Sequence, residues 1–573
     1  MSITPPFSDF RPIYVPTYPP PAHQRTSFPP STLEASSLAA LSTEYGKDKE
    51  GVTLVQFGLP TPQHNPTQLR RQLKARHIAM ISIGGVIGTG LFLGTAQSLQ
   101  KAGPLGLLLA YMIVGSMVWC MMISLGEMVS HLPLGGGHIT LASRTVDSAF
   151  GMAVGWTYCA NWLLVFPAEL SAAAVLISMW SDANPAEWIA ICYVCVLTIN
   201  VAGTRVWAEV EWAVALIKVI TILGLIILGI VISAGGVPGT DSTGFTYWRS
   251  PGAFAQYLGI PGALGRFAGF WSVLTQAAYA YVGSEIVSLA AGEARNPRAS
   301  LPRAIHLVVC RIALFYIVGV FVIGLVVPSN DPALGKQDGT ALSSPFVIAI
   351  ERAGIKALPS IANAAFLTSA TSAASSGLYT ASRCLYGLAI NGNAPQIFTR
   401  LNSYGLPYVS VCACSLFGLL SFMSAGSHNA SIVFTWLSNC CAVGGLMSWA
   451  CICAIYLRFY YGAKAQDIPR SVFPYQSSFQ PYAAYYALIG LCIILFTQGF
   501  DVFIHDNWNT AEFVTKYLMI VLFPIVYFAT RLYQRCELIP LPAIDFFSGS
   551  RDNDESEELP PKGALQRLWY ALA

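Results

Sequence analysis

The sequence is short of charge. Asp, Glu, Lys and Arg make up 11% of its 573 residues, whereas soluble globular proteins carry roughly 25%. Hydrophobic residues make up 54%. The segment 214–232, VALIKVITILGLIILGIVI, is long enough to cross the roughly 20 residues of a bilayer core and contains one lysine. The shortage of charge therefore excludes an ordinary soluble fold and indicates a membrane protein.

The sequence also lacks motifs of catalysis and cofactor binding. Its 14 cysteines lie mostly within apolar segments, without the histidine neighbours of a metal site, and are expected to be small core residues. No nucleophile or nucleotide motif points to an enzyme, so we expect neither a metal nor a cofactor. A net charge of +3 gives no reason to expect a nucleic-acid partner.

A signal peptide is missing as well. The chain opens with MSITPPFSDFRPIYVPTYPPP, which is too polar and too rich in proline for one. We predict that residues 1–75 are a disordered cytoplasmic tail, that residues 76–535 form a transmembrane domain in the lipid bilayer, and that residues 536–573 are a short acidic cytoplasmic tail.

Apolar stretches bounded by Gly, Pro or charge predict an all-α polytopic membrane protein with twelve transmembrane helices. The predicted spans are 78–99, 104–130, 149–180, 187–203, 210–234, 267–291, 306–328, 358–390, 407–424, 431–459, 482–500 and 514–533.

Basic residues support this even number of spans. If the N-terminal tail is cytoplasmic, the cytoplasmic side receives Arg70, Arg71, Lys74, Arg76, Arg144, Arg205, Arg295, Arg298, Arg303, Arg311, Arg383, Arg400, Arg458, Lys464, Arg470, Arg531 and Arg535. The other side receives chiefly Lys101, Arg249, Arg266, Lys336, Arg352 and Lys356. The asymmetry agrees with the positive-inside rule and with both termini in the cytoplasm. A sequon at Asn429, in a short loop on the opposite side, is a possible glycosylation site.

Two spans have interrupted helical patterns. The first contains GGVIGTGLF at 84–92, and the sixth contains AYAYVGSE, which ends at the intramembrane Glu285. Each glycine costs a helix interior about 1 kcal/mol relative to alanine. Close helix packing and an unwound, ligand-binding backbone are both compatible with these glycines taken alone. A phosphate loop is excluded, because no strand precedes the glycines and no Gly-Lys-Ser follows them.

The spacing of the interruptions favours unwinding. They lie five helices apart, and many secondary transporters consist of two inverted five-helix repeats that each begin with a broken helix, with the substrate between the breaks. Irregular backbone at that depth is tolerated only where it lines a cavity or is buried in protein.

Four segments of the chain contain long motifs. They are IGGVIGTGLFLGT, SLGEMVSHLPLGGGHITLASRTVDSAFGMAVGWTYCANW, EVEWAVALIKVI and AYVGSEIVSLAAGEARNPRASLPRAI. In this order they resemble the fungal amino acid permeases of the amino acid–polyamine–organocation superfamily. FPAELSAAAVLI and GLPYVSV are most similar to the dicarboxylic amino acid permease branch.

The resemblance implies a core of 5+5 helices in inverted repeats with broken helices 1 and 6, plus two peripheral helices. It also implies proton-coupled symport of amino acids, acidic or of broad range, at the plasma membrane by alternating access. Rival functions are an amino acid sensor on the same fold that does not transport, and a permease for another amine. By resemblance the tails, with Lys47 and Lys49, would meet trafficking and ubiquitination machinery, and solvated tails without such a role are the alternative.

A substrate site between the breaks needs groups for both ends of an amino acid. Backbone N–H groups of Gly88, Thr89 and Gly90 suit an α-carboxylate at the positive end of a half-helix. Carbonyls that unwinding frees suit the α-ammonium. By resemblance the third and tenth spans add side chains, and Ser372, Ser375 and Ser376 of the eighth span could reach the pocket. The predicted substrate-binding residues are Val86, Gly88, Thr89, Gly90, Asn161, Glu169, Tyr279, Tyr281, Val282, Gly283, Ser375, Asn439 and Cys441.

Charged residues inside the spans are candidates for proton coupling or gating. They are Lys218, Glu169, Glu285, Glu211 and Glu127. By analogy with sodium-coupled relatives of the fold, Lys218 could replace a sodium ion, or it could simply pair with Glu211. Glu285 could carry protons or tie the sixth-helix break to its neighbours. Tyr279 is a candidate gate above the substrate, and an interfacial or core tyrosine is the alternative.

Overall fold

A computed structural model describes residues 73–85, 87–238, 241–294, 297–335, 344–425, 430–504 and 507–548. Within these ranges the secondary structure is helical apart from one isolated bridge between Leu73 and Ala294. Most of the predicted N-terminal tail, with Lys47 and Lys49, lies outside the described residues, and so does Asn429.

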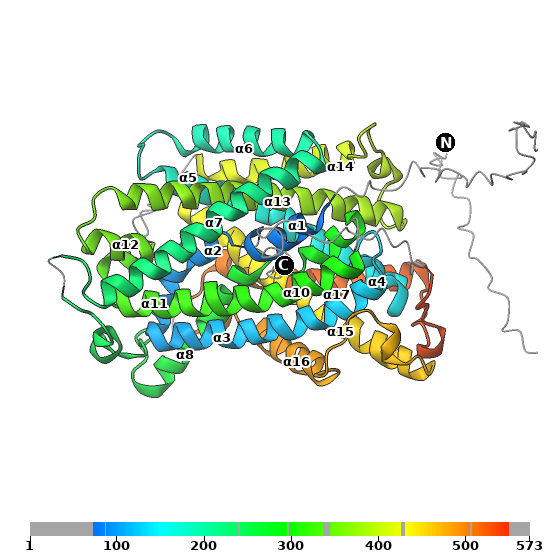
Figure 1. The fold of residues 1–573 in the computed structure, drawn as a ribbon. Coiled ribbons are helices and arrows are strands. Elements are labelled where there is room, and N and C mark those ends of the chain that lie inside the picture. The colour runs from blue at the N-terminus through cyan, green and yellow to red at the C-terminus, as the bar shows by residue number, and fades with distance from the viewer. Residues whose placement is uncertain are drawn as a thin grey trace, which may run out of the picture. The chain divides into compact units, whose positions relative to one another are not determined.

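The helices follow one another as the ribbon in Figure 1 shows. The first half contains α1 (Ala75–Met80), η1 (Ile81–Gly85), α2 (Thr89–Phe92), α3 (Gly94–His131), α4 (His138–Thr145), α5 (Ser148–Ile177), α6 (Pro185–Val201), α7 (Thr204–Ser233), η2 (Trp248–Gly252), α8 (Gly262–Tyr281), α9 (Ile286–Ala290) and η3 (Ala291–Glu293). The second half contains α10 (Pro297–Arg311), η4 (Ile312–Val318), α11 (Gly319–Val326), η5 (Pro332–Gly335), α12 (Pro345–Arg352), α13 (Leu358–Ile390), η7 (Gln396–Thr399), α14 (Tyr408–Ser415), η8 (Leu416–Ala425), α15 (Ala430–Ala465), η9 (Arg470–Val472), α16 (Tyr482–Thr497), η10 (Phe500–Phe503), α17 (Thr510–Gln534) and η11 (Leu541–Ala543).

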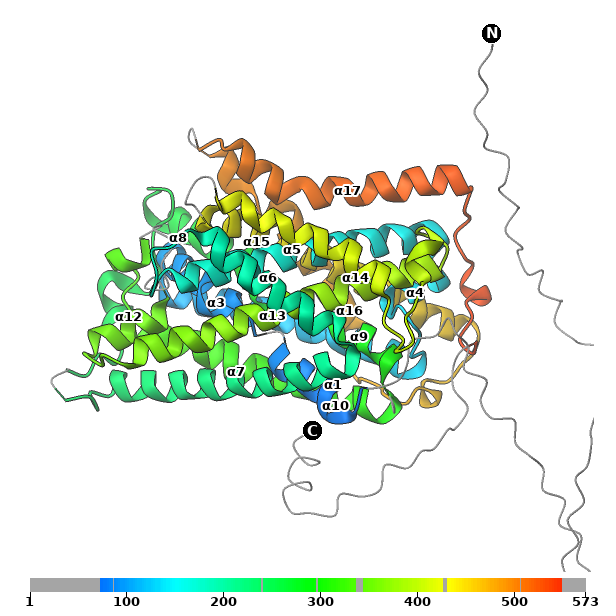
Figure 2. The same cartoon turned by 90° about the horizontal axis from the view of Figure 1, so that it is seen from above.

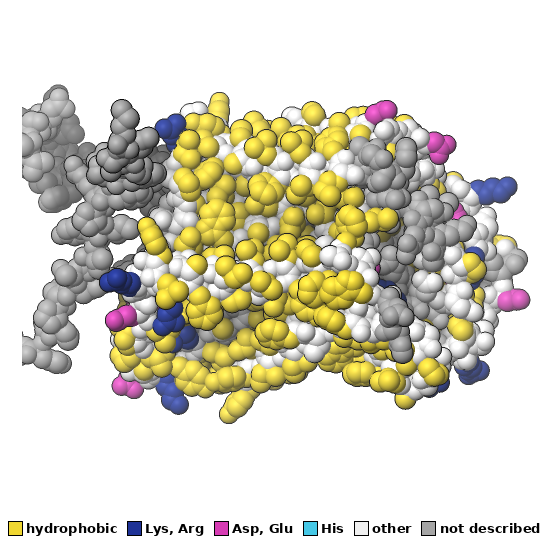
Figure 3. Space-filling model, turned by 180° about the vertical axis from the view of Figure 1, so that it is seen from behind, with side chains coloured by type: hydrophobic (Ala, Val, Ile, Leu, Met, Phe, Trp, Pro, Cys, Tyr) yellow, Lys and Arg dark blue, Asp and Glu magenta, His cyan; other side chains and the backbone are white. Residues whose placement is uncertain are grey.

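Many of these helices suit a membrane. In the described part of the chain, 8 are long and apolar enough to cross one, and α6 and the α14–η8 segment are shorter apolar helices. Figure 3 shows a broad apolar face with charged side chains gathered at its two ends. Each of the twelve predicted spans overlaps helical residues. The number of membrane crossings stays a prediction.

The most polar predicted span, α13, lies inside the bundle. Its small residues allow close contact with α5: a Cβ added at Gly377 would lie 3.3 Å from the Phe166 amide nitrogen, and the Cys384 thiol donates to the Gly155 carbonyl over 3.4 Å. In contrast, α17 runs along the edge of the bundle beside α15 (Figure 2). A helix that packs mainly against other helices and little against lipid does not need high hydropathy, which explains the polar sequence of α13.

Helical geometry is interrupted at both predicted places. The first helix ends in the five-residue π-helix η1, Ile87 and Gly88 are non-helical, and the chain turns helical again at Thr89. The sixth predicted span ends its first half at Tyr281 and resumes at Ile286, with Gly283 at φ 101° between them.

Gly84 has a packing role that is separate from the break. A Cβ at this position would lie 2.7 Å from the Ala215 Cβ and 3.0 Å from the Ala215 carbonyl oxygen. The first helix can therefore approach α7 closely only because residue 84 has no side chain.

The predicted gap between the first two spans is a kink. Gly103 has φ 74° inside α3, and Pro104 follows it. A Cβ at Gly103 would lie 2.7 Å from the Ala255 amide nitrogen, and that amide donates to the Ala102 carbonyl over 3.1 Å. The predicted connection between two helices is therefore a kink within the single helix α3, and the loop before α8 packs against this kink.

Residues 538–548 pack onto one end of the bundle. Ile544 and Phe546 are 3% and 1% exposed. The Ile539 amide donates to the Val146 carbonyl over 2.9 Å, and His131 Nε2 is 2.9 Å from the Phe546 carbonyl oxygen. We call residues 538–548 the C-terminal strap. The first part of the predicted C-terminal tail is thus attached to the helices.

Candidate functional site

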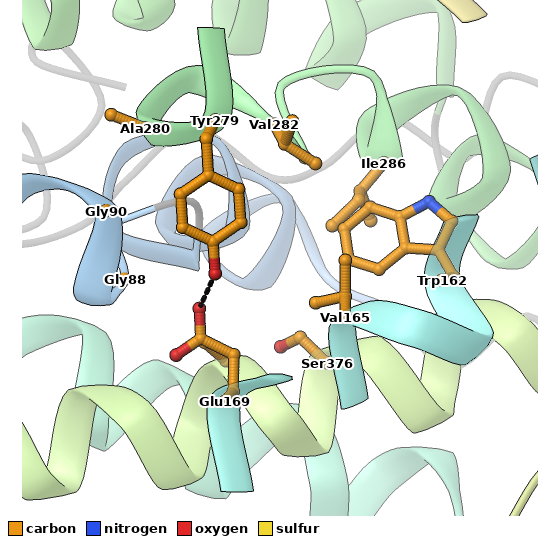
Figure 4. A pocket seen from close by; sticks show the side chains of 12 residues that line it. Gly88, Gly90, Trp162, Val165, Glu169, Tyr279, Ala280, Val282, Ile286 and Ser376 are labelled. Atoms are coloured by element: carbon orange, nitrogen blue, oxygen red, sulfur yellow. Dashed lines mark hydrogen bonds between the residues drawn. The ribbon is translucent and has the colours of Figure 1, made fainter. Parts of the chain in front are cut away.

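A small cavity lies where the two helix breaks face α5 and α13. Its volume is about 30 Å³, which is room for about one water molecule. Figure 4 shows the side chains that converge on it. The lining residues are Gly88, Gly90, Trp162, Val165, Glu169, Tyr279, Ala280, Val282, Gly283, Ile286, Ala373 and Ser376.

Glu169 of α5 is the only acidic residue among the described residues that line this cavity, and it is 4% exposed. The Thr89 hydroxyl lies 3.0 Å from both carboxylate oxygens, and the Tyr279 hydroxyl donates to Oε1 over 3.1 Å. A Cβ at Gly88 would lie 3.3 Å from the same oxygen. One carboxylate therefore joins the first break, α5 and the end of α8.

Several predicted residues lie beside the cavity instead of lining it. The Ser375 hydroxyl is 3.0 Å from Asn200 Nδ2, on the side of α13 that faces α6. The Tyr281 hydroxyl donates to the Tyr111 carbonyl over 3.1 Å. The Cys441 thiol donates to the Asn161 carbonyl over 3.9 Å. Val86 lies outside the described residues.

Sequence reasoning missed some lining residues. Trp162 precedes Glu169 by seven positions, which places both on nearly the same face of a helix, whereas Asn161 is turned further away. Among the three serines of the eighth span that the sequence offers for the pocket, Ser376 lines the cavity and Ser375 lies beside it. The helical period was an available signal for Trp162. The choice between adjacent serines depends on the rotation of α13, which the sequence leaves open.

A second, larger cavity of about 460 Å³ lies between the start of α3, α8, α15 and the start of α17. Asn439 lines this one, together with Lys101, Asp501 and Lys516. Lys516 Nζ lies 2.8 Å from both Asp501 carboxylate oxygens. The larger cavity is therefore polar and contains charged groups.

An aromatic pair lies between the two cavities. The rings of Tyr279 and Phe434 meet edge to face, with centroids 6.1 Å apart and planes at 71°. Tyr279 lines the small cavity and Phe434 lines the large one. A rotation of either side chain would change the separation between them.

Lys218 and Glu211 are neighbours on α7. Lys218 Nζ lies 3.7 Å from Glu211 Oε1, and the Ser372 hydroxyl of α13 donates to Glu211 Oε2 over 2.6 Å. Both charged side chains are buried, at 1% and 3% exposure, and neither lines the small cavity. The two residues are seven positions apart, about 10 Å along the helix axis, and the length of the lysine side chain bridges this separation.

The other two carboxylates join different helices. Glu285 accepts a hydrogen bond from Trp449 Nε1 over 2.8 Å. Glu127 accepts from the Tyr456 hydroxyl, from Arg470 Nη2 and, over 2.6 Å, from the Ser477 amide. Neither lines the cavity between the breaks. Across the described ranges, no group of three or more His, Cys, Asp or Glu residues could hold a metal ion.

Comparisons with known proteins agree with the motifs. Residues 77–539 match the family model described as amino acid permease. The chain is 40% identical to the lysine-specific permease of Saccharomyces cerevisiae over 510 residues, 88% of this chain and 83% of that one. It is also 40% identical to the dicarboxylic amino acid permease of that yeast over 509 residues, with the same coverage. Identity to the proline-specific permease of Emericella nidulans is 37% over 553 residues, 93% of this chain and 99% of that one.

Proposed function

The chain belongs to the amino acid permease family, and from that premise we propose that it is a proton-coupled symporter that imports amino acids across the plasma membrane by alternating access. The observation that carries the proposal is the small cavity between the two helix breaks, which is lined by Glu169. A space of about 30 Å³ is too small for an amino acid. The cavity must therefore widen to admit substrate, and the described conformation corresponds to a closed step of the cycle.

The backbone of the first break supplies the substrate carboxylate site in this proposal. Gly88 and Gly90 leave the backbone accessible from the cavity, and Thr89 adds a hydroxyl. The Glu169 carboxylate occupies this region in the closed form, because Thr89 donates to it. The substrate carboxylate and an ionised Glu169 would repel each other.

That repulsion gives a physical basis for coupling. A protonated Glu169 no longer repels the incoming carboxylate and can donate a hydrogen bond to it. Proton and amino acid then bind together and leave together, which is the requirement for symport. Glu169 is therefore our first candidate for the proton carrier, and Tyr279, which is bonded to it, is the gate.

Lys218 is the second candidate. Its ammonium makes no hydrogen bond within the described part of the chain, and its nearest carboxylate is that of Glu211 at 3.7 Å. A buried ammonium of this kind can act as a fixed or titrating cation. Glu285 and Glu127 have partners that join helices to one another, which supports structural or gating roles for both.

His138 is a poor proton carrier, although it lies near the sixth-helix break. It belongs to the short helix α4 and is 2.9 Å from the Ser288 hydroxyl. Burial lowers the pKa of His138 to about 3. The imidazole therefore stays neutral through the pH range in which the protein would work.

Uptake of labelled amino acids into cells without their own permeases tests the function. We expect uptake that rises with an inward proton gradient and falls when a protonophore removes it. Normal surface expression with no uptake of any amino acid would contradict transport and favour the sensor alternative. Uptake that ignores the proton gradient would contradict coupling.

The topology is part of the proposal. We propose twelve spans, a core of inverted repeats and both termini in the cytoplasm, supported by the helices that overlap each predicted span and by the clustering of basic residues. Protease protection of tags at the two termini would test the orientation. Accessibility of either tag from outside intact cells would contradict it.

A further inference from the structure

Arg311 differs from the other described basic residues that the charge pattern placed on the cytoplasmic side. It is the last residue of α10 and is 1% exposed. The ion pairs formed by the described residues do not include it. A buried guanidinium without a paired carboxylate is costly, and inside a membrane protein it indicates a functional role.

The partners of Arg311 belong to both interrupted helices. Arg311 Nη1 donates to the Ser82 carbonyl in η1. Arg311 Nη2 donates to the Ser284 hydroxyl over 2.6 Å, and Ser284 lies in the turn between α8 and α9. A single side chain therefore contacts the backbone of η1, which precedes the first break, and the turn that interrupts the sixth predicted span.

Both contacts lie at helix C-termini. Ser82 is within the last four residues of the helix that ends at Gly85, where carbonyls lack intrahelical partners. The Ser284 hydroxyl donates in turn to the carbonyl of Tyr281, the last residue of α8, over 2.8 Å. The C-terminus of a helix bears a partial charge of about −0.5. The guanidinium contacts one such end directly and the other through the Ser284 hydroxyl, which explains how a buried cation is stabilised without an ion pair.

Further contacts join the segments around Arg311 to one another. The Ser82 hydroxyl donates to the Ala304 carbonyl of α10 over 2.7 Å, so η1 is joined to α10 at two points. The Tyr281 and Tyr316 rings pack with centroids 4.4 Å apart.

We propose that Arg311 is a positioning residue, a cation built into the chain that neutralises the C-terminal ends of both interrupted helices and so sets the geometry of the cavity between them. The part that concerns substrate binding rests on the proposed function. The part that concerns the breaks does not.

Hydrogen–deuterium exchange of the purified full-length protein tests the breaks directly. The variants are Arg311→Gln, Arg311→Lys, Ser284→Ala and Ser82→Ala, and the peptides to follow cover 79–85 and 281–289. Arg311→Gln should speed exchange at least tenfold in both peptides, and Arg311→Lys should restore both to within about threefold. Ser284→Ala should speed exchange in 281–289 alone.

Ser82→Ala is the matched control, because it removes the bond to Ala304 and keeps the carbonyl that Arg311 uses. It should change exchange in either peptide less than threefold. Exchange in Arg311→Gln within twofold of the unmodified protein, or equal effects of Ser82→Ala and Arg311→Gln, would overturn the proposal. If Arg311→Gln cannot be purified, exchange is measured on Arg311→Met, for which the same increases in both peptides are expected; an increase below twofold would overturn the proposal.

Uptake measurements test the part of the proposal that concerns substrate binding. At equal surface amounts, Arg311→Gln should raise the apparent KM for the transported amino acid at least tenfold, and Arg311→Lys should recover most of it. An unchanged KM with a lower maximal rate would overturn the role at the substrate site. If the unmodified protein transports no amino acid, the proposed function fails, while the exchange comparison still decides whether Arg311 holds the breaks.

Discussion

Among single residues, Glu169 is the point where three elements meet. It belongs to α5, accepts a hydrogen bond from Thr89 of α2 and accepts another from Tyr279 of α8. Its third close neighbour, Gly88, has no side chain that could separate the carboxylate from the first break. A change at any of these positions should therefore affect substrate binding before it affects folding.

Tyr279→Phe removes one donor to Glu169 and keeps the ring against Phe434. A hydrogen bond to a charged group contributes about 1.5–3 kcal/mol, and each 1.4 kcal/mol is about tenfold in an equilibrium constant. We expect the apparent KM of uptake to rise about tenfold at equal surface amount.

Tyr111→Phe is the matched control for this experiment, because the Tyr111 ring is also buried and its hydroxyl has no partner in the described structure. It should leave the apparent KM within twofold. Equal effects of the two substitutions would argue against a role of the Tyr279 hydroxyl at the site.

Variants of Lys218 and Glu211 distinguish a role in proton coupling from a role in the stability of the protein. Lys218→Met leaves Glu211 buried beside Ser372 alone, and breaking a buried ion pair costs about 3–5 kcal/mol. We expect a reduced surface amount and no accumulation against a gradient. The double variant Lys218→Met with Glu211→Gln removes both charges, and it should recover the surface amount without recovering accumulation. Proton-driven accumulation by the double variant would show that Lys218 has only a structural role.

At the scale of elements, the interrupted helices and the C-terminal strap hold distant segments together. The strap contacts the ends of α3, α15 and the α4–α5 connection: Arg458 donates to the Thr145 carbonyl over 2.7 Å and also to the Ile539 carbonyl. Gln466 donates to the Ile544 carbonyl over 2.8 Å. These contacts make the strap part of the folded domain.

Phe546→Ala tests the contribution of the strap. Truncation of a buried phenylalanine costs about 3–5 kcal/mol, and Phe546 packs against Phe459 with ring centroids 5.0 Å apart. We expect a clear fall in the Tm of the purified protein. Phe547→Ala is the control, since Phe547 is 58% exposed, and it should change the Tm little. Equal Tm values for the two variants would mean that the strap adds no stability.

At the scale of the whole molecule, substrate binding should raise the thermal stability of the purified protein. A ligand that binds only the folded protein adds about 2.7 kcal/mol at a concentration of 100 Kd. We expect that amino acids which raise the Tm of the purified protein are those that compete in uptake. The relatives are named for lysine, dicarboxylic amino acids and proline, so all standard amino acids should be compared. Strong competitors that leave the Tm unchanged would contradict binding to the folded form.

Much of this molecule follows from local properties of the sequence. The shortage of charge indicates the membrane, and glycines at 84–90 and at 283 mark both interruptions, because hydropathy and helix propensity act over short stretches. Glu169 could be singled out for the same reason, as a carboxylate in an apolar span. The long motifs identify the family.

Which side chains meet was decided by the packing of helices. Lining of the cavity by Ser376 and not Ser375 depends on how α13 is rotated against α5. In the sequence, Arg311 looks like another basic residue near a membrane surface. The structure places it at the end of α10, in contact with Ser82 and Ser284 of the two interrupted helices. The sequence by itself determined the class of protein and where its helices break. Only the tertiary structure decided the partners of each buried charge, because those partners come from segments far apart in the chain.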